Sequence, residues 1–202
     1  MGIRNSLSKS KRYFFAFSAA IVCMAAATLS SRADIIESFE TTPQPFWSIN
    51  EVRAGAFKQA IDDAHGEGSG AMNLEVLGGR FQGGYENSIL DFFLTPRPHV
   101  GTTIAFGKTD EFYFGVTWDV KLPIDRTFFE ASFGGAAHDG PLHELEVASY
   151  GCQVNFRESA SLGFALTPDW RLMTTIDHMS NAGLCGNNRG LTNAGVRLGI
   201  KF

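Results

Sequence analysis

Short segments in which apolar and polar residues alternate recur along this chain, separated by glycine, asparagine, aspartate and proline. The clearest runs from Glu111 to Lys121, and its apolar residues share one face: Phe112, Phe114, Val116, Trp118 and Val120. Seven further segments show the pattern less cleanly: about 47–57, 71–79, 98–106, 127–137, 150–166, 170–181 and 192–202. A period of two residues is that of a β-strand, so the pattern predicts eight strands, with no long amphipathic helix.

Alternation alone fits two architectures. A soluble sandwich turns its apolar face inward, whereas a membrane barrel turns that face to lipid and fills its lumen with polar side chains. Aromatic-rich faces, small or charged residues opposite them, 18 phenylalanines and the C-terminal Phe202 favour the barrel. We therefore predict an all-β fold, an eight-stranded antiparallel transmembrane β-barrel of the bacterial outer membrane, over residues 47–202.

The first 33 residues have the features of a secretory signal peptide. Basic residues precede an apolar stretch from Tyr13 to about Leu29, and Ser31-Arg32-Ala33 offers small residues at −3 and −1 of a cleavage site. The apolar stretch is at the short limit for a spanning helix. We expect cleavage before Asp34, followed by an N-terminal periplasmic arm over residues 34–46.

Processing changes the charge of the chain. Residues 1–33 hold five of the 17 lysines and arginines and none of the 21 acidic residues, so a mature chain of 169 residues carries a net charge of −9. An acidic exported domain is a poor binder of nucleic acid. Two cysteines remain, Cys152 and Cys185, in a compartment where disulfides persist.

A candidate hydrolytic pair lies on the predicted strand 170–181. The run Asp177-His178-Met179-Ser180-Asn181 places an imidazole and a hydroxyl two residues apart, and such side chains share one face of a strand. His178 can then act as the base that activates Ser180 as a nucleophile. Both residues lie on the face of Leu172 and Ile176, which otherwise meets lipid.

The position of this pair along the strand indicates its depth in the membrane. His178 lies eight residues after Trp170, which follows the expected periplasmic turn Thr167-Pro168-Asp169. Eight residues span about 26 Å of strand, or about 20 Å across a membrane at a tilt of about 40°. The hydrocarbon band is about 25 Å tall. We expect His178 and Ser180 near the outer-leaflet boundary, at the level of the ester groups of lipopolysaccharide.

Two runs near the C-terminus carry a family resemblance: His-Met-Ser-Asn-Ala-Gly-Leu at 178–184 and Asn-Arg-Gly-Leu at 188–191, before a terminal barrel strand. From about residue 157 onward the chain resembles the outer-membrane lipid A 3-O-deacylases of the PagL type, with weaker similarity at 98–101, 117–120 and 132–136. The resemblance implies an eight-stranded barrel with a lipid-facing Ser-His-Glu site. It also implies a cofactor-free and metal-free esterase that removes the 3-O-linked hydroxyacyl chain of lipid A.

The resemblance assigns roles and partners as well. Ser180 would be the nucleophile, His178 its general base, and Asn181 would help to form the oxyanion hole. The implied partners are lipopolysaccharide as substrate, outer-membrane lipid and the barrel assembly machinery. Thr192 departs from the pattern, because the family places a glutamate twelve residues after the serine. Threonine faces the right way but supplies no negative charge to an imidazolium.

Hairpin pairing offers a substitute acid. If Leu166 pairs with Trp170 across the turn, Glu158 lies opposite His178 on the lipid-facing side. A carboxylate there is costly without a partner. We therefore expect Glu158 to orient His178; pairing with a loop cation is the alternative. Asn181 likewise has an alternative role, as the first residue of the outer loop.

The same pairing predicts a disulfide. It places Cys152 opposite Leu184, one residue from Cys185, so the bond would tie the sixth strand to the outer loop near the site.

Three rival functions stay open at this stage. A catalytically inactive barrel of the same fold could bind or modulate lipopolysaccharide, and Thr192 favours that alternative. A soluble periplasmic β-barrel or sandwich could hold a ligand inside. Cleavage of glycerophospholipids would use the same residues on a different substrate.

Overall fold

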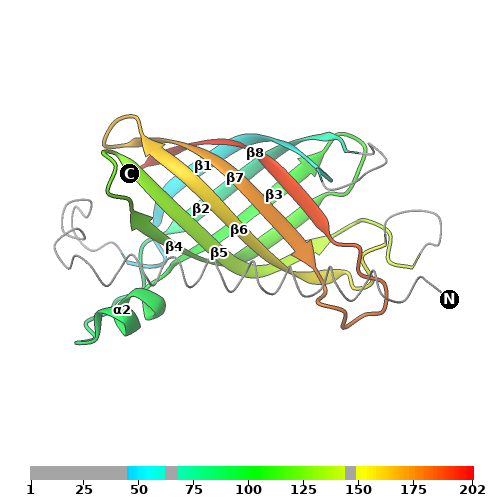
Figure 1. The fold of residues 1–202 in the computed structure, drawn as a ribbon, viewed down its shortest axis with the longest axis horizontal. Helices are drawn as coiled ribbons and strands as arrows, with labels where there is room; N and C mark the ends of the chain where they lie inside the picture. The colour runs from blue at the N-terminus through cyan, green and yellow to red at the C-terminus, as the bar shows by residue number, and fades with distance from the viewer. Residues whose placement is uncertain (1–44, 62–67, 144–148) are drawn as a thin grey trace. The chain divides into compact units, whose positions relative to one another are not determined.

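The computed structural model describes residues 45–61, 68–143 and 149–202. The predicted signal peptide and residues 34–44 of the predicted arm lie outside the described residues. Eight strands form the fold (Figure 1): β1 (Ile49–Lys58), β2 (Gly70–Gly78), β3 (Arg97–Ala105), β4 (Glu111–Lys121), β5 (Thr127–His138), β6 (Val154–Ala165), β7 (Trp170–Ser180) and β8 (Leu191–Lys201). Each overlaps one of the eight predicted segments.

The strands close into a barrel. Each pairs with its neighbours in sequence order, and β8 pairs with β1 in antiparallel fashion, so no strand edge is left open. The predicted eight-stranded antiparallel barrel is confirmed. We call the end that carries the β1–β2, β3–β4, β5–β6 and β7–β8 connections the loop end. The opposite end, where β1 begins and the C-terminus lies, is the terminal end (Figure 1).

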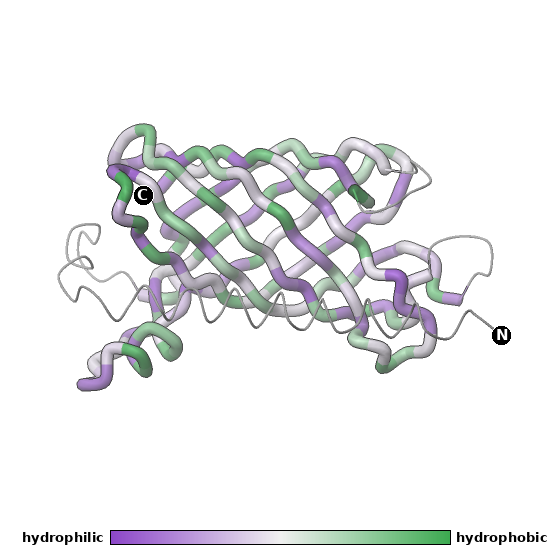
Figure 2. Tube along the Cα trace, viewed as in Figure 1, coloured by the Kyte–Doolittle hydropathy of each residue, from purple (hydrophilic) through white to green (hydrophobic). Residues whose placement is uncertain are grey.

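The two faces of the wall have opposite chemistry. Outward-facing side chains are mostly apolar, and several are more than half exposed, such as Met72, Phe114 and Leu162 at 55–57%. Many inward-facing side chains are polar or charged and buried, such as Arg53 and Arg197, which are each 1% exposed. Stretches of higher and lower hydropathy therefore alternate along the strands of the wall (Figure 2). This is the inverse of a soluble fold and is the pattern of a membrane barrel.

Ion pairs fill the part of the lumen nearest the terminal end. Arg53 contacts three carboxylates, Glu51 at 2.8 Å, Glu75 at 3.1 Å and Glu130 at 2.8 Å, and Arg171 lies 3.1 Å from Glu130. Buried charges need partners, because desolvation costs several kcal/mol per ion. The contacts of Glu130 with Arg53 and Arg171 cross the lumen between strands that do not pair with each other, and they stabilise the wall from inside.

One element was not predicted from the sequence pattern, the short helix α2 (Ser88–Leu94) in the β2–β3 connection at the terminal end. Asn87 caps it by accepting hydrogen bonds from the backbone of Ile89 and Leu90. Trp118 of β4 donates a hydrogen bond from Nε1 to the carbonyl of Phe93 (3.1 Å), which attaches the helix to the wall. Among the described residues no helix is long and apolar enough to cross a membrane.

Strand β6 begins later than predicted, at Val154 rather than 150. Gly151 has a φ of 77°, in the left-handed region, and its amide donates to Leu142 O across the β5–β6 connection. The chain therefore turns at this point instead of continuing the strand.

Candidate active site

The predicted pair lies at the loop end of β7, where Ser180 is the last residue of the strand. Neighbouring Asp177 and Met179 point into the lumen and are buried, so His178 and Ser180 face outward by alternation. Ser180 is nevertheless only 8% exposed. The site therefore combines an outward orientation with a largely covered hydroxyl.

Thr192 contacts the imidazole directly. It stands opposite His178 in the β7–β8 pairing, and its Oγ1 lies 2.8 Å from His178 Nδ1. A donor Nδ1–H in this hydrogen bond leaves Nε2 as the proton acceptor. The threonine thus occupies the place from which an acid would orient the ring.

Glu158 lies on the other side of the same histidine. The β6–β7 register pairs Glu158 with His178, which confirms the position predicted from the turn. Its Oε1 atom is buried and has no hydrogen-bond partner among the described residues. His178 therefore stands between a hydroxyl on β8 and a carboxylate on β6.

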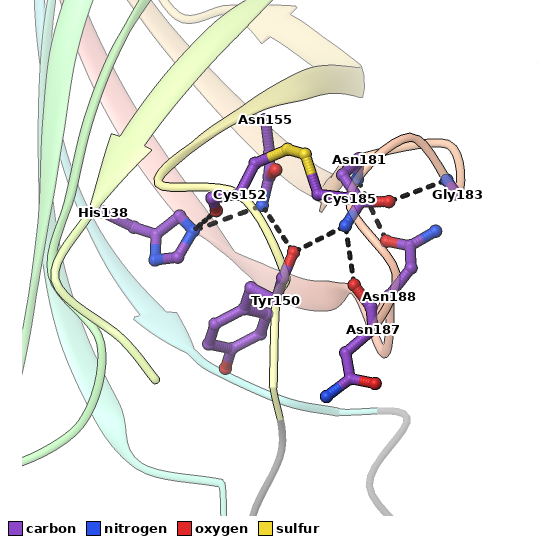
Figure 3. Close-up of a disulfide and its surroundings, with 9 residues drawn as sticks. All are labelled: His138, Tyr150, Cys152, Asn155, Asn181, Gly183, Cys185, Asn187 and Asn188. Carbon is purple, nitrogen blue, oxygen red and sulfur yellow. Dashed lines mark hydrogen bonds between the residues drawn. A yellow bond between two sulfur atoms is a disulfide. The ribbon is translucent and has the colours of Figure 1, made fainter. Parts of the chain in front are cut away.

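Asn181 organises the loop that follows Ser180 (Figure 3). Its Nδ2 donates to the carbonyls of Tyr150 and Asn187, both at 2.7 Å, and its Oδ1 accepts from the amide of Gly183 at 2.7 Å. Its own amide donates to Asn188 Oδ1 at 3.0 Å. Asn181 is 2% exposed, so its hydrogen-bonding groups serve the loop in this structure.

Gly190 is a site residue to which sequence reasoning gave no role. It has a φ of 74°, and a Cβ at this position would lie 2.7 Å from His178 Cε1 and 2.9 Å from Nε2. Such contacts are closer than van der Waals packing allows, so only glycine leaves the imidazole room. The signal in the sequence was the run Asn-Arg-Gly-Leu at 188–191, but the contact itself depends on the fold.

The predicted disulfide is present and joins the two connections around the site. Cys152 and Cys185 are bonded, with Cα atoms 5.4 Å apart, so the β5–β6 connection is tied to the β7–β8 connection (Figure 3). The carbonyl of Tyr150, two residues before Cys152, is the acceptor for Asn181. The bond therefore closes the loop beside Ser180.

A polar cluster supports the site from inside the lumen. Asp177 forms an ion pair with Arg157 at 3.0 Å and accepts a hydrogen bond from Asn193 at 2.9 Å; Asn193 also donates to Glu111 at 3.0 Å. Asp177 and Asn193 are the neighbours of His178 and Thr192 on their strands. As expected from the alternation, Asp177 faces away from the candidate pair.

Fold and site together define an outer-membrane type of β-barrel with a serine and a histidine on its lipid-facing wall. The sequence profile of the lipid A 3-O-deacylase (PagL) family matches residues 78–201, more than half of the chain. The chain belongs to this family. The match includes every candidate site residue named from the sequence.

The fold is shared with a solved structure. The crystal structure of the outer membrane enzyme PagL is similar with a TM-score of 0.57 and 20% identity, over 75% of this chain and 99% of that one. The N-terminal β-barrel domain of Pseudomonas aeruginosa OprF gives a TM-score of 0.47 and 12% identity, over 75% of this chain and 98% of that one. Comparison with curated proteins finds no match.

Proposed function

We propose that this chain is a serine esterase of the outer membrane that removes the 3-O-linked hydroxyacyl chain from lipid A. The observation that carries the proposal is the outward placement of His178 and Ser180 on a barrel of the lipid A 3-O-deacylase family. An ester-cleaving pair on the lipid-facing wall takes its substrate from the membrane. In the same proposal, residues 1–33 are a signal peptide that is cleaved during export.

The reaction follows from the residues present. Ser180 Oγ attacks the ester carbonyl carbon while His178 Nε2 takes the hydroxyl proton. The tetrahedral intermediate collapses, the sugar 3-hydroxyl leaves with the proton from His178, and the acyl chain stays on Ser180. Water then attacks this acyl ester with His178 again as the base, and releases the hydroxy fatty acid and the free serine.

Two neighbours divide the role of the family acid. Thr192 Oγ1 holds the ring through Nδ1, and Glu158 on the next strand supplies the negative charge that favours an imidazolium. The predicted oxyanion role of Asn181 stays a prediction. Its Nδ2 would have to release the carbonyl of Tyr150 or of Asn187 to reach an ester oxygen.

The test of the function is mass spectrometry of lipid A from cells that express the wild-type chain or a variant. Wild-type cells should lose one hydroxyacyl chain, and Ser180→Ala cells should keep it. Thr174→Ala is the matched control, because Thr174 is an exposed outward-facing hydroxyl on the same strand. Unchanged lipid A with wild-type protein folded in the outer membrane would contradict the proposal.

The role of Glu158 has its own test. Glu158→Gln should lower kcat/KM about tenfold, the order expected when one unit charge near an imidazolium is removed. Glu86→Gln, at an exposed carboxylate beyond the terminal end of β2, is the control. Undiminished activity in Glu158→Gln would remove this residue from the mechanism.

One observation favours a second function. Thr192 stands where the family has glutamate, and a neutral residue there fits an inactive barrel that binds or modulates lipopolysaccharide. This alternative predicts that Ser180→Ala and wild type give the same lipid A. If both lack activity toward lipid A, release of fatty acid from glycerophospholipid vesicles distinguishes a phospholipase from an inactive barrel.

A further inference from the structure

Only two outward-facing positions of the described strands carry a formal charge, Lys58 at the end of β1 and Glu158 on β6. Charges on the lipid-facing wall of a barrel are costly and are best tolerated near the interfaces. Both lie toward the loop end, one on each side of His178. The proposed function uses Glu158 but leaves Lys58 without a role.

The register places Lys58 within reach of the site. Lys58 pairs with Ala194 of β8, and Ala194 pairs with Ile176 of β7, two residues before His178. One strand therefore separates the lysine from the candidate pair, and the backbones of β1 and β7 lie about 10 Å apart. The outward side chains between them, Ala194 and Thr192, are small, so no bulky group blocks this stretch of wall.

Lys58 is suited to an anionic ligand. Its side chain is exposed, and it forms no ion pair with the carboxylates of the described ranges. Lysine carries a point charge on a flexible four-carbon stem and is a common binder of phosphate. A cation at the outer interface meets the phosphorylated head groups of the outer leaflet.

We propose that Lys58 binds a phosphate group of the lipid A head group and thereby positions the 3-O ester over Ser180. This inference rests on the proposed function. Glu158, on the far side of His178, repels the same phosphate, so the two charges select one orientation. The phosphate lies over β1 and β8, and the chain to be cleaved lies over β6 and β7.

The test compares two substrates with identical acyl chains, lipid A with its phosphates and dephosphorylated lipid A, in mixed detergent micelles. Wild-type protein should prefer the phosphorylated substrate by about tenfold or more in kcat/KM, as one charge-assisted contact predicts. Lys58→Gln should abolish this preference, and Lys58→Arg should retain most of it. A preference that survives in Lys58→Gln would overturn the proposal.

Lys108→Gln is the matched control. Lys108 is an exposed lysine at the same end of the barrel, in the β3–β4 connection on the opposite wall. Its removal makes the same change in net charge and should leave the phosphate preference intact. An equal loss in Lys108→Gln would assign the effect to general electrostatic attraction and would also overturn the proposal.

A binding measurement separates this site from catalysis. Native mass spectrometry in the Ser180→Ala background should show a lipid A complex that weakens on dephosphorylation or on Lys58→Gln. If wild-type protein does not turn over lipid A but this binding pattern holds, the deacylase fails and the phosphate site stands. If the protein turns over lipid A but this binding pattern is absent, the phosphate site at Lys58 is overturned and the deacylase stands. If phosphatidylglycerol displaced lipid A as well as lipid A itself does, the proposal that the Lys58 site selects the lipid A head group would be overturned.

Discussion

At the scale of single residues, the candidate site is set by what touches the imidazole of His178. Thr192 Oγ1 hydrogen-bonds Nδ1 at 2.8 Å, and the backbone of Gly190 lies against Cε1 and Nε2. The first contact orients the ring, and the second, at a residue without a Cβ, leaves space for it. Neither contact supplies charge, and in the proposed mechanism that charge comes from Glu158, which pairs with His178 across β6 and β7.

Replacing Thr192 tests this division of roles. Thr192→Glu should raise kcat/KM about tenfold or more, because a carboxylate at Nδ1 both orients and stabilises the imidazolium. Thr192→Val should lower kcat/KM by about one to two orders of magnitude, because the ring loses its hydrogen-bond partner while the shape is kept. Deacylation assays on purified protein measure both. A Thr192→Val variant as active as wild type would show that the hydroxyl has no part in orienting the ring.

Gly190→Ala tests the space beside the ring. The added methyl group would meet the imidazole, so kcat/KM should fall at least about tenfold while the barrel still folds. Gly186→Ala is a close control, because Gly186 has a similar φ of 78° and its added Cβ would meet nothing within 4 Å. Both variants carry the same backbone strain of about 1–2 kcal/mol. Equal activity in the two would contradict the proposed contact.

At the scale of elements, the loop after β7 is held by groups that come from distant parts of the chain. Asn181 binds the carbonyl of Tyr150, and the Cys152–Cys185 disulfide joins the same two connections. These contacts place the end of β7, and with it Ser180, against a closed loop. The loop is therefore part of the site and not a free surface segment.

Asn181→Asp tests the loop with almost no change in shape. The carboxylate cannot donate to the carbonyls of Tyr150 and Asn187, and each unsatisfied buried acceptor costs about 1–3 kcal/mol. We expect at least about a tenfold loss of activity. The loop end should also become less stable, which hydrogen exchange of its backbone amides would measure. Asn187→Asp makes the same change on an exposed side chain of the same loop. This variant should keep the activity and the stability of the loop end near those of the wild type.

The strands and their register were predictable because both follow from local rules. The period of two residues placed eight strands, and one turn, 166–170, set the pairing of Glu158 with His178. Helix α2 was not predictable in the same way, because five of its seven residues are apolar and show no clear period. The start of β6 was missed because the left-handed turn at Gly151 depends on contacts within the β5–β6 connection.

The chemistry of the site was predictable only in part. Alternation brought His178 and Ser180 to one face, but the hydrogen bond of Thr192 depends on side-chain orientation across β7 and β8. The partners of Asn181 could not be foreseen, because Tyr150 lies 31 positions away in the sequence. Contacts that follow from strand alternation and register can be predicted from a sequence. Contacts between loops cannot, because they form only in the tertiary structure.

At the scale of the whole molecule, the interior of the barrel is a network of charges. Arg53, Arg197, Glu51 and Tyr113 are all at most 1% exposed, although each faces the lumen. Their mutual contacts occupy the space that water fills in wider barrels. The lumen therefore acts as a largely polar core that stabilises the wall, and the candidate pair lies outside it.

A filled lumen predicts no ion conduction. Protein reconstituted in planar lipid bilayers should give no single-channel steps, because ions would have to displace paired arginine and glutamate side chains. A porin inserted in the same bilayers serves as the positive control. Regular conductance steps from the purified barrel would show that the luminal network opens in the membrane.

The outward orientation of His178 and Ser180 also determines how this protein meets its substrate. A site on the wall is reached only by molecules already dissolved in the same leaflet, so encounters occur in two dimensions. The relevant concentration is then the number of lipid A molecules per unit of membrane area, and the volume of the surrounding solution is immaterial. In mixed micelles, added detergent should slow turnover by surface dilution even when the total amount of lipid A is constant. The fluidity and lateral packing of the leaflet thus become parameters of the reaction rate.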